Sequence, residues 1–197
     1  EGFYLEGNTV YESVGLDGKS KLMKYTLGSS TNSKEAKQPD NIFSEGISSV
    51  GNKIYQLTYK DRKIFVYDKN SFELLNELPM PNQMVEGWGM TTDGKYLIAS
   101  DGTKNIFFLN SSDPSKMIKY ISVAGNKEVY DSINELEYHD NSIYANVWQK
   151  PIILKINPKT GEVVGKFDFS AIAKKHITNE DHVLNGIAFK GENMLIT

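Results

Sequence analysis

Residues 43–59 read FSEGISSVGNKIYQLTY, and this stretch has the pattern of two β-strands joined by a tight turn. β-Branched and aromatic residues occur on both sides of Gly51-Asn52, a dipeptide that suits a hairpin turn. A carboxylate, Glu45, stands where the first apolar strand begins. Charged side chains are rarely buried without partners, so this position requires an explanation.

The hairpin pattern recurs along the chain. Each repeat opens with a polar residue, a small or polar neighbour and an apolar residue, and the openers start at Glu1, Glu45, Glu86, Asn134 and Asn185. The intervals are 44, 41, 48 and 51 residues, and short strand-like runs with turn signals fill each of them. A period of about 40–50 residues with four strands is typical of a β-propeller blade. We therefore predict an all-β, five-bladed β-propeller that forms a single domain over residues 1–197.

The last repeat is shorter than the others. Residues 184–197, LNGIAFKGENMLIT, have room for about two strands. The last blade is therefore expected to be incomplete, and the chain is expected to be a piece of a somewhat longer protein. Residues 170–183 depart from the strand pattern and could hold a short helix.

The composition argues against several classes of function. The chain has no cysteine, so it has no disulfide, thiolate metal site or cysteine nucleophile. Its formal net charge is −3, without the excess of Lys and Arg that a nucleic-acid partner requires. No apolar run approaches the roughly 18 residues of a membrane span. The histidines lack metal-ligand spacing, and we predict neither a metal nor a cofactor.

Propeller geometry accounts for the polar openers. The first strand of each blade lines the central channel, so residues that recur at its start converge on one axis. Glycine next to the opener permits the close approach of backbones near that axis. The predicted ring of polar side chains at the channel mouth consists of Glu1, Glu45, Glu86, Asn134 and Asn185.

Several motifs together resemble those of the plant-type glutaminyl-peptide cyclotransferases, a family that also occurs in bacteria. They cover nearly the whole chain in the family's order and read FSEGI, GNKIYQLTY, EGWGMTTDGKYLIASDG, INELEY, IYANVW, INPKTGEVVG and LNGIAF. EGWGMTTDG together with NELEY and IYANVW is specific, whereas NPKTG is a common turn. The resemblance implies a five-bladed propeller that converts N-terminal glutamine of peptides into pyroglutamate and releases ammonia, which makes it an aminoacyltransferase.

The resemblance also assigns roles to residues. Glu45 in F-x-E-G matches the catalytic glutamate, and Asn134 in N-E-L-E matches the asparagine that orients the substrate. The resemblance implies that Phe43, Tyr59, Trp88 and Trp148 line the substrate pocket, and the polar openers Glu1, Glu86 and Asn185 are predicted to bind the substrate with them. Tyr59 stands where the family has a pocket tryptophan, and only Glu1-Gly2 remains of the family's first motif, F-T-[QE]-G.

The implied chemistry needs one carboxyl group. Glu45 would accept a proton from the attacking amine and return it to the leaving nitrogen, and an apolar setting would raise its pKa toward a useful value. Asn134 would donate a hydrogen bond to the amide oxygen as negative charge develops. The expected partners are peptides with N-terminal glutamine, and we expect a monomer. The family is usually sent through the secretory route, so a secreted, vacuolar or membrane-tethered protein is expected.

Two other functions fit parts of the pattern. A ring of Glu and Asn oxygens at the blade openers would suit a calcium-dependent, lactonase-like propeller hydrolase. A non-catalytic interaction propeller is the second alternative, although the Gly-His and Trp-Asp signatures of WD repeats are absent. On their own, Trp88 and Trp148 would be read as core between blades, and Glu45 and Glu86 as solvated rim residues.

Overall fold

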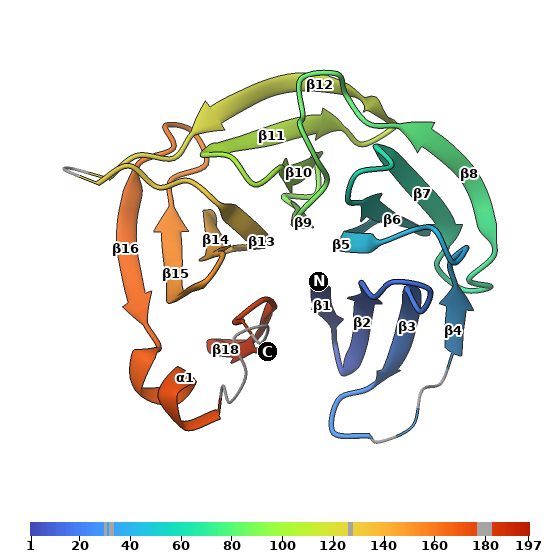
Figure 1. Ribbon diagram of the computed structural model, residues 1–197, viewed down its shortest axis with the longest axis horizontal. Helices are drawn as coiled ribbons and strands as arrows, with labels where there is room; N and C mark the ends of the chain where they lie inside the picture. The colour runs from blue at the N-terminus through green and yellow to red at the C-terminus, as the bar shows by residue number, and fades with distance from the viewer. Residues whose placement is uncertain (30, 32–33, 126–127, 177–182) are drawn as a thin grey trace.

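The computed structural model describes residues 1–29, 31, 34–125, 128–176 and 183–197. Its strands form antiparallel sheets arranged around a central axis, which confirms the predicted all-β propeller (Figure 1). In each four-stranded sheet the strands are neighbours in chain order, and the first strand lies nearest the axis. The starts of these first strands therefore meet at one end of the channel.

Four sheets have four strands each. Blade 1 contains β1 (Gly2–Glu6), β2 (Thr9–Val14), β3 (Lys21–Thr26) and β4 (Lys34–Lys37). Blade 2 contains β5 (Ser44–Val50), β6 (Lys53–Thr58), β7 (Lys63–Asp68) and β8 (Leu74–Pro79). Blade 3 contains β9 (Met90–Thr92), β10 (Tyr96–Ser100), β11 (Asn105–Asn110) and β12 (Asp113–Ser122). Blade 4 contains β13 (Ile133–His139), β14 (Ser142–Val147), β15 (Lys150–Ile156) and β16 (Val163–Asp168).

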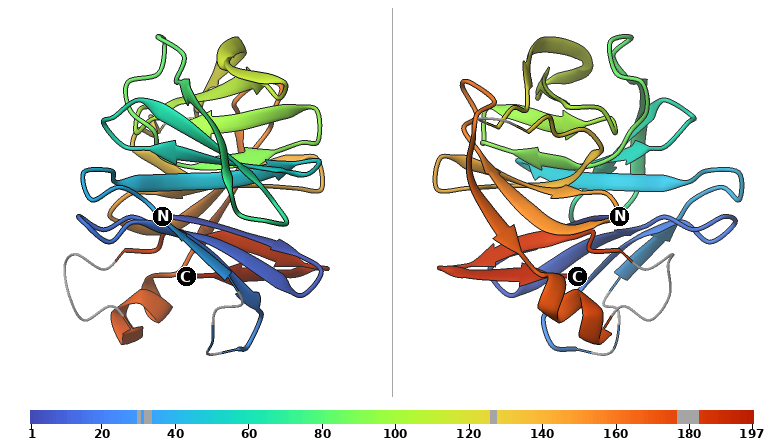
Figure 2. Two further views of the ribbon diagram at one scale, coloured as in Figure 1. Left: turned by 90° about the vertical axis from the view of Figure 1, so that its right-hand side faces the viewer. Right: turned by 60° about the vertical axis from the view of Figure 1, so that its left-hand side comes forward.

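The predicted number of blades is wrong, because the described residues form four blades rather than five. The fifth opener, at Asn185, leads into a hairpin of only two strands, β17 (Ile187–Lys190) and β18 (Asn193–Ile196). This hairpin lies between blade 4 and blade 1, beside β1 in both views of Figure 2. An opener predicts the inner strand of a sheet, but it does not determine how many strands follow.

The hydrophobic core lies between neighbouring sheets. Fully buried Ile98 of blade 3 and Ile143 of blade 4 belong to one cluster, and similar clusters fill the junctions between blades 1 and 2 and between blades 2 and 3. The hairpin contributes to both of its junctions, because Ile187 packs with Tyr144 of blade 4 and Ala188 packs with Phe3 of blade 1. Burial of alternate strand residues on both sheet faces thus holds the ring of sheets together.

Glycines bring the inner strands close to one another. A Cβ atom on Gly46 would lie 2.4 Å from the Met90 nitrogen, and one on Gly89 would lie 2.2 Å from the Asn134 oxygen. Such distances are too short for any side chain, so these positions require glycine. Gly46 thus agrees with the expected close approach beside its opener, whereas in blade 3 the close contact with the next inner strand is made by Gly89 and not by Gly87 beside the predicted opener.

One short helix interrupts the strands. Helix α1 (Ser170–His176) lies within the stretch where a helix was expected, and residues 177–182 of that stretch lie outside the described residues. No helix in the described part of the chain is long and apolar enough to cross a membrane.

Candidate functional site

Two inner strands carry a bulge at the mouth of the channel. The register of β5 against β6 shifts between Ser44 and Ile47, and that of β13 against β14 shifts between Ile133 and Leu136. The bulged pairs are Glu45-Gly46 and Asn134-Glu135. Bulges redirect side chains, and these place Glu45 and Asn134 at equivalent positions of two blades.

Blade 3 presents Trp88 at this position. Gly46 N–H donates to the Trp88 carbonyl oxygen at 2.6 Å, and Gly89 is the residue that contacts the next inner strand. Glu86, the predicted opener of this blade, lies two residues before Trp88 and does not occupy the equivalent position. The equivalent positions, which we call the mouth ring, are therefore Glu1, Glu45, Trp88, Asn134 and Asn185.

Carboxylates gather around Glu45. Its side chain is buried, with 7% of its surface exposed, and it lies within hydrogen-bonding reach of Glu1. Glu1 in turn accepts a 2.5 Å hydrogen bond from the Asn185 side-chain amide. Burial raises the pKa of Glu45 well above its usual range, and the negative charges of Glu1 and Glu86 raise it further. A carboxyl with a raised pKa is a candidate for proton transfer at a functional site.

The two tryptophans face each other. The ring centroids of Trp88 and Trp148 are 5.9 Å apart at an interplanar angle of 80°, an edge-to-face contact. Trp148 is 44% exposed, so the pair forms part of a wall rather than core between blades. The indole N–H of Trp88 donates to Glu86 Oε2 at 3.0 Å, which connects this wall to the carboxylates.

The loop before Trp88 is held by two charged residues that the sequence had not indicated. Arg62 donates to the carbonyl oxygens of Pro81 and Val85 at 3.1 and 2.8 Å. Asp101 accepts the Val85 N–H at 2.9 Å. Both residues lie in turns, where polar side chains are ordinary, so their sequence positions gave no signal.

A second aromatic pair lies on blade 2. The rings of Phe43 and Tyr59 have centroids 6.1 Å apart, and the Tyr59 N–H donates to the Phe43 carbonyl oxygen at 3.0 Å. Gly87 N–H donates to the Tyr59 carbonyl oxygen at 3.0 Å, so this pair adjoins the segment that carries Glu86. Lys60 lies over the Tyr59 ring, with its ammonium 4.8 Å from the centroid.

Asn134 is 4% exposed, and its backbone is fixed from the neighbouring blade. The Ser100 hydroxyl donates to the Asn134 carbonyl oxygen at 2.7 Å and accepts the Gly89 N–H, also at 2.7 Å. The structure thus brings together the predicted residues Glu1, Glu45, Glu86 and Asn185, and it fixes Asn134 against the blade that presents Trp88.

Two carboxyl groups that follow Asn134 on β13 have unusual surroundings that the sequence did not predict, one fully buried and the other half-buried. Glu135 is fully buried, and its Oε2 accepts the Ile187 N–H at 2.9 Å. Burial raises the pKa of Glu137 to about 8. The available signal was NELE itself, because two acidic residues alternate with apolar ones inside a strand between buried neighbours.

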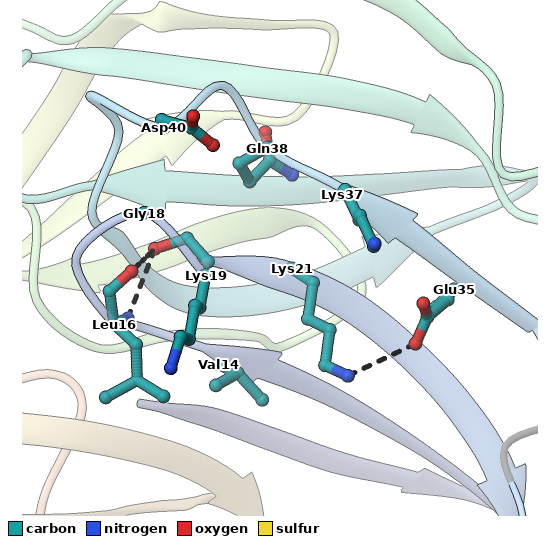
Figure 3. A pocket seen from close by; sticks show the side chains of 10 residues that line it. Val14, Leu16, Gly18, Lys19, Lys21, Glu35, Lys37, Gln38 and Asp40 are labelled. Carbon is teal, nitrogen blue, oxygen red and sulfur yellow. Dashed lines mark hydrogen bonds and ion pairs between the residues drawn. The ribbon is translucent and has the colours of Figure 1, made fainter.

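The cavity in Figure 3 lies apart from the mouth ring. It has a volume of about 450 Å³ and is lined by residues of blade 1 and its loops, including Leu16, Lys19 and the Lys21–Glu35 ion pair at 3.1 Å. None of the predicted site residues lines it. Over the described residues, no three His, Asp or Glu side chains are grouped so that they could hold a metal ion.

Comparison with known proteins places these features in a family. The sequence model of the family described as glutamine cyclotransferase matches residues 1–197. The chain is 33% identical over 196 residues to the glutaminyl-peptide cyclotransferase of Arabidopsis thaliana, covering 98% of this chain and 60% of the relative's length. The crystal structure of Myxococcus xanthus glutaminyl cyclase superposes with a TM-score of 0.87 at 28% identity, covering all of this chain and 84% of that one.

Proposed function

The chain belongs to the glutamine cyclotransferase family, and we propose on this basis that it converts N-terminal glutamine of peptides into pyroglutamate with release of ammonia. The observation that carries the proposal is the buried Glu45 carboxyl among Glu1, Glu86 and Asn185 at the channel mouth. The chain spans 60% of the length of its curated relative, so activity is proposed for the protein to which this chain belongs.

The reaction forms one bond and breaks one. The neutral α-amine attacks the side-chain amide carbon, which forms the ring C–N bond and a tetrahedral intermediate. Glu45 accepts a proton from the amine and returns it to the amide nitrogen, and the C–N bond to that nitrogen then breaks to release ammonia. The attack is intramolecular, so holding the folded conformer of glutamine supplies much of the catalysis.

The neighbouring residues have complementary roles in this proposal. Asn134 donates a hydrogen bond to the oxygen that becomes negative in the intermediate. Trp88 and Trp148, with Phe43 and Tyr59, enclose the aliphatic part of the glutamine side chain and exclude water. Burial and the charges of Glu1 and Glu86 keep the pKa of Glu45 high, so that proton return to the leaving nitrogen is favourable, and Asn185 holds Glu1 by a hydrogen bond.

The test is ammonia release from a short peptide that begins with glutamine, measured on the full-length protein. We expect turnover in the wild type and a loss of about 100-fold or more in Glu45→Gln, because the amide cannot accept the proton. Glu12→Gln is the matched control, since Glu12 lies on β2 and hydrogen-bonds Tyr25 instead of the mouth ring. Full activity in a folded Glu45→Gln protein would contradict the assigned role.

The same assay separates the alternatives. A calcium-dependent hydrolase would lose activity with a chelator, regain it with calcium and hydrolyse lactones, whereas the proposed reaction is insensitive to chelation. An interaction propeller would bind peptides without releasing ammonia. We expect release that survives chelation.

Two further proposals concern the cellular route of the protein and its oligomeric state. The protein is proposed to follow the secretory route, which the family's usual location and the Asn110-Ser111-Ser112 sequon favour. It is also proposed to act as a monomer. Mass analysis of the protein from a eukaryotic host tests for a glycan on Asn110, and sedimentation at assay concentration tests the oligomeric state.

A further inference from the structure

Glu135 occupies a position that other inner strands give to glycine. It follows Asn134 in the bulge of β13, as Gly46 follows Glu45 in the bulge of β5. In blades 1 and 3 the corresponding residues are Gly2 and Gly89, and each touches the backbone of the next inner strand so closely that no Cβ would fit. At the junction of β13 with the hairpin, a carboxyl side chain therefore stands where the junctions that follow blades 1, 2 and 3 have direct backbone contact.

The Glu135 carboxyl connects three inner strands. It projects from β13, its Oε2 accepts the N–H of Ile187 on β17 at 2.9 Å, and the backbone N–H of Phe3 on β1 also faces it. Ile187 lies two residues after Asn185, and Phe3 lies two residues after Glu1. One side chain thus fixes the strand starts that carry three members of the mouth ring.

The surroundings of Glu135 disfavour a charged carboxylate. The residue is fully buried, and its Oε1 has no hydrogen-bond partner among the residues that the structure describes. Burial raises the pKa of Glu135 well above its usual range, and the nearby Glu137 raises it further. A neutral carboxyl can leave Oε1 without a partner at a lower free-energy cost than a carboxylate can, and its other oxygen still accepts N–H groups.

We propose that Glu135 is a positioning residue for the cyclisation site: its carboxyl oxygen holds the backbones of β17 and β1 against β13 and so fixes Asn185 and Glu1 relative to Asn134. The inference rests on the proposed function for its kinetic consequence. Asn185 and Glu1 form the contact beside Glu45, so a displaced strand start would change the surroundings of the proton-transferring group. A shift of about 1 Å in such groups can lower a rate by about 100-fold.

The experiment compares Glu135→Gln, Glu135→Asp and Glu135→Ala by kcat and KM for a glutamine-initiated peptide and by thermal unfolding. Glutamine keeps the length of the side chain and an acceptor oxygen, aspartate withdraws the acceptor by one methylene, and alanine removes it. Glu12→Gln is the control, because Glu12 lies on β2 and hydrogen-bonds Tyr25, away from Glu135 and the mouth ring.

We expect kcat within about threefold of wild type in Glu135→Gln and a loss of about 10- to 100-fold in Glu135→Asp, measured where both are folded, with KM less affected. If Glu135→Ala folds, it should resemble Glu135→Asp. Unchanged kcat in the folded aspartate variant would overturn the proposal, as would equal loss in the glutamine and aspartate variants. Absence of ammonia release from the wild type would instead refute the proposed function, which separates the two failures.

Discussion

The carboxyl group of Glu45 lies in surroundings that disfavour its charged form. Burial contributes most to its raised pKa, and Glu1 and Glu86 add repulsion. A proton shuttle must accept and release a proton in one catalytic cycle, which works best when its pKa is near the working pH. In the proposed reaction, the residues around Glu45 would therefore tune proton transfer as well as contact the substrate.

This tuning predicts that Glu86→Gln shifts the pH profile. Removing the charge of Glu86 lowers the pKa of Glu45, so the acidic inflection of kcat should move to lower pH by about 0.5–1 unit. The amide keeps an oxygen that can accept the indole N–H of Trp88. The profile of kcat against pH tests this. The control is Glu77→Gln, a change at an exposed ion pair with Lys63, and an unshifted inflection in Glu86→Gln would refute the charge effect.

Glu137 predicts a second pH effect, on stability. Its pKa in the folded protein is about 8, raised by burial from the ordinary value of about 4.5 for a glutamate, so between these values the folded protein binds more protons than the unfolded chain. The free energy of unfolding should therefore fall as the pH rises from about 5 to about 8, with a slope from this group of at most about 1.4 kcal/mol per pH unit.

Urea unfolding across this pH range measures the slope. Glu137→Gln should flatten it, because the amide does not titrate but can still accept the Thr91 hydroxyl. Part of the slope will remain, because the pKa values of Glu45 and Glu135 are also raised. If Glu137→Gln had the same slope of unfolding free energy against pH as the wild type, Glu137 would have the same pKa in the folded and unfolded protein.

At the scale of single elements, the turn after β10 supports the tryptophan wall. Gly102 has a φ of +77°, and a Cβ there would lie 2.6 Å from the Trp88 ring. The turn thus needs glycine both for its left-handed backbone and for the space that Trp88 occupies. The preceding Asp101 holds the Val85 N–H, so one turn supports the tryptophan and the loop before it.

Gly102→Ala is therefore predicted to disturb substrate binding. Alanine should displace the Trp88 ring, change the tryptophan fluorescence and raise KM by about tenfold, in addition to a backbone cost of about 1 kcal/mol. Gly28→Ala is the matched control, because Gly28 has a similar φ of +84° but no atom within 4 Å of its would-be Cβ. Equal KM values in the two variants would show that only the backbone strain matters.

The sequence predicted individual elements better than their count and register. Period-2 strands and turn dipeptides indicated the all-β propeller, because both are local properties. E-G-W-G offers two glycines, however, and only the contact of Gly89 with Asn134 identifies Trp88 as the ring residue. Glu135 was missed because its burial depends on partners from distant segments, such as the N–H of Ile187. Contacts between distant segments produce no periodic pattern in the sequence around Glu135.

At the scale of the whole molecule, the hairpin β17–β18 completes the surroundings of the mouth. Its strands lie between blade 4 and blade 1, and the N- and C-terminal ends of the chain both lie near the centre of Figure 1. Asn185 reaches Glu1 across 184 positions of the sequence, so the site contains residues from the beginning and the end of the chain. Formation of the site therefore depends on closure of the whole ring of sheets and not on one blade.

This dependence predicts that two equal losses of core packing will have different effects on activity. Ile187 and Ile106 are both fully buried isoleucines, but Ile187 packs between the hairpin and blade 4, whereas Ile106 packs between blades 3 and 4. Each Ile→Ala change should lower the free energy of unfolding by about 2–5 kcal/mol. Only Ile187→Ala should also lower kcat/KM in the folded protein, because it loosens the strand whose N–H bonds Glu135 and whose start carries Asn185.

Urea unfolding and peptide cyclisation, measured under conditions where both variants are folded, separate the two effects. Equal kcat/KM in the two variants would mean that the mouth ring keeps its geometry when the hairpin is loosened, and that the blades alone hold the site.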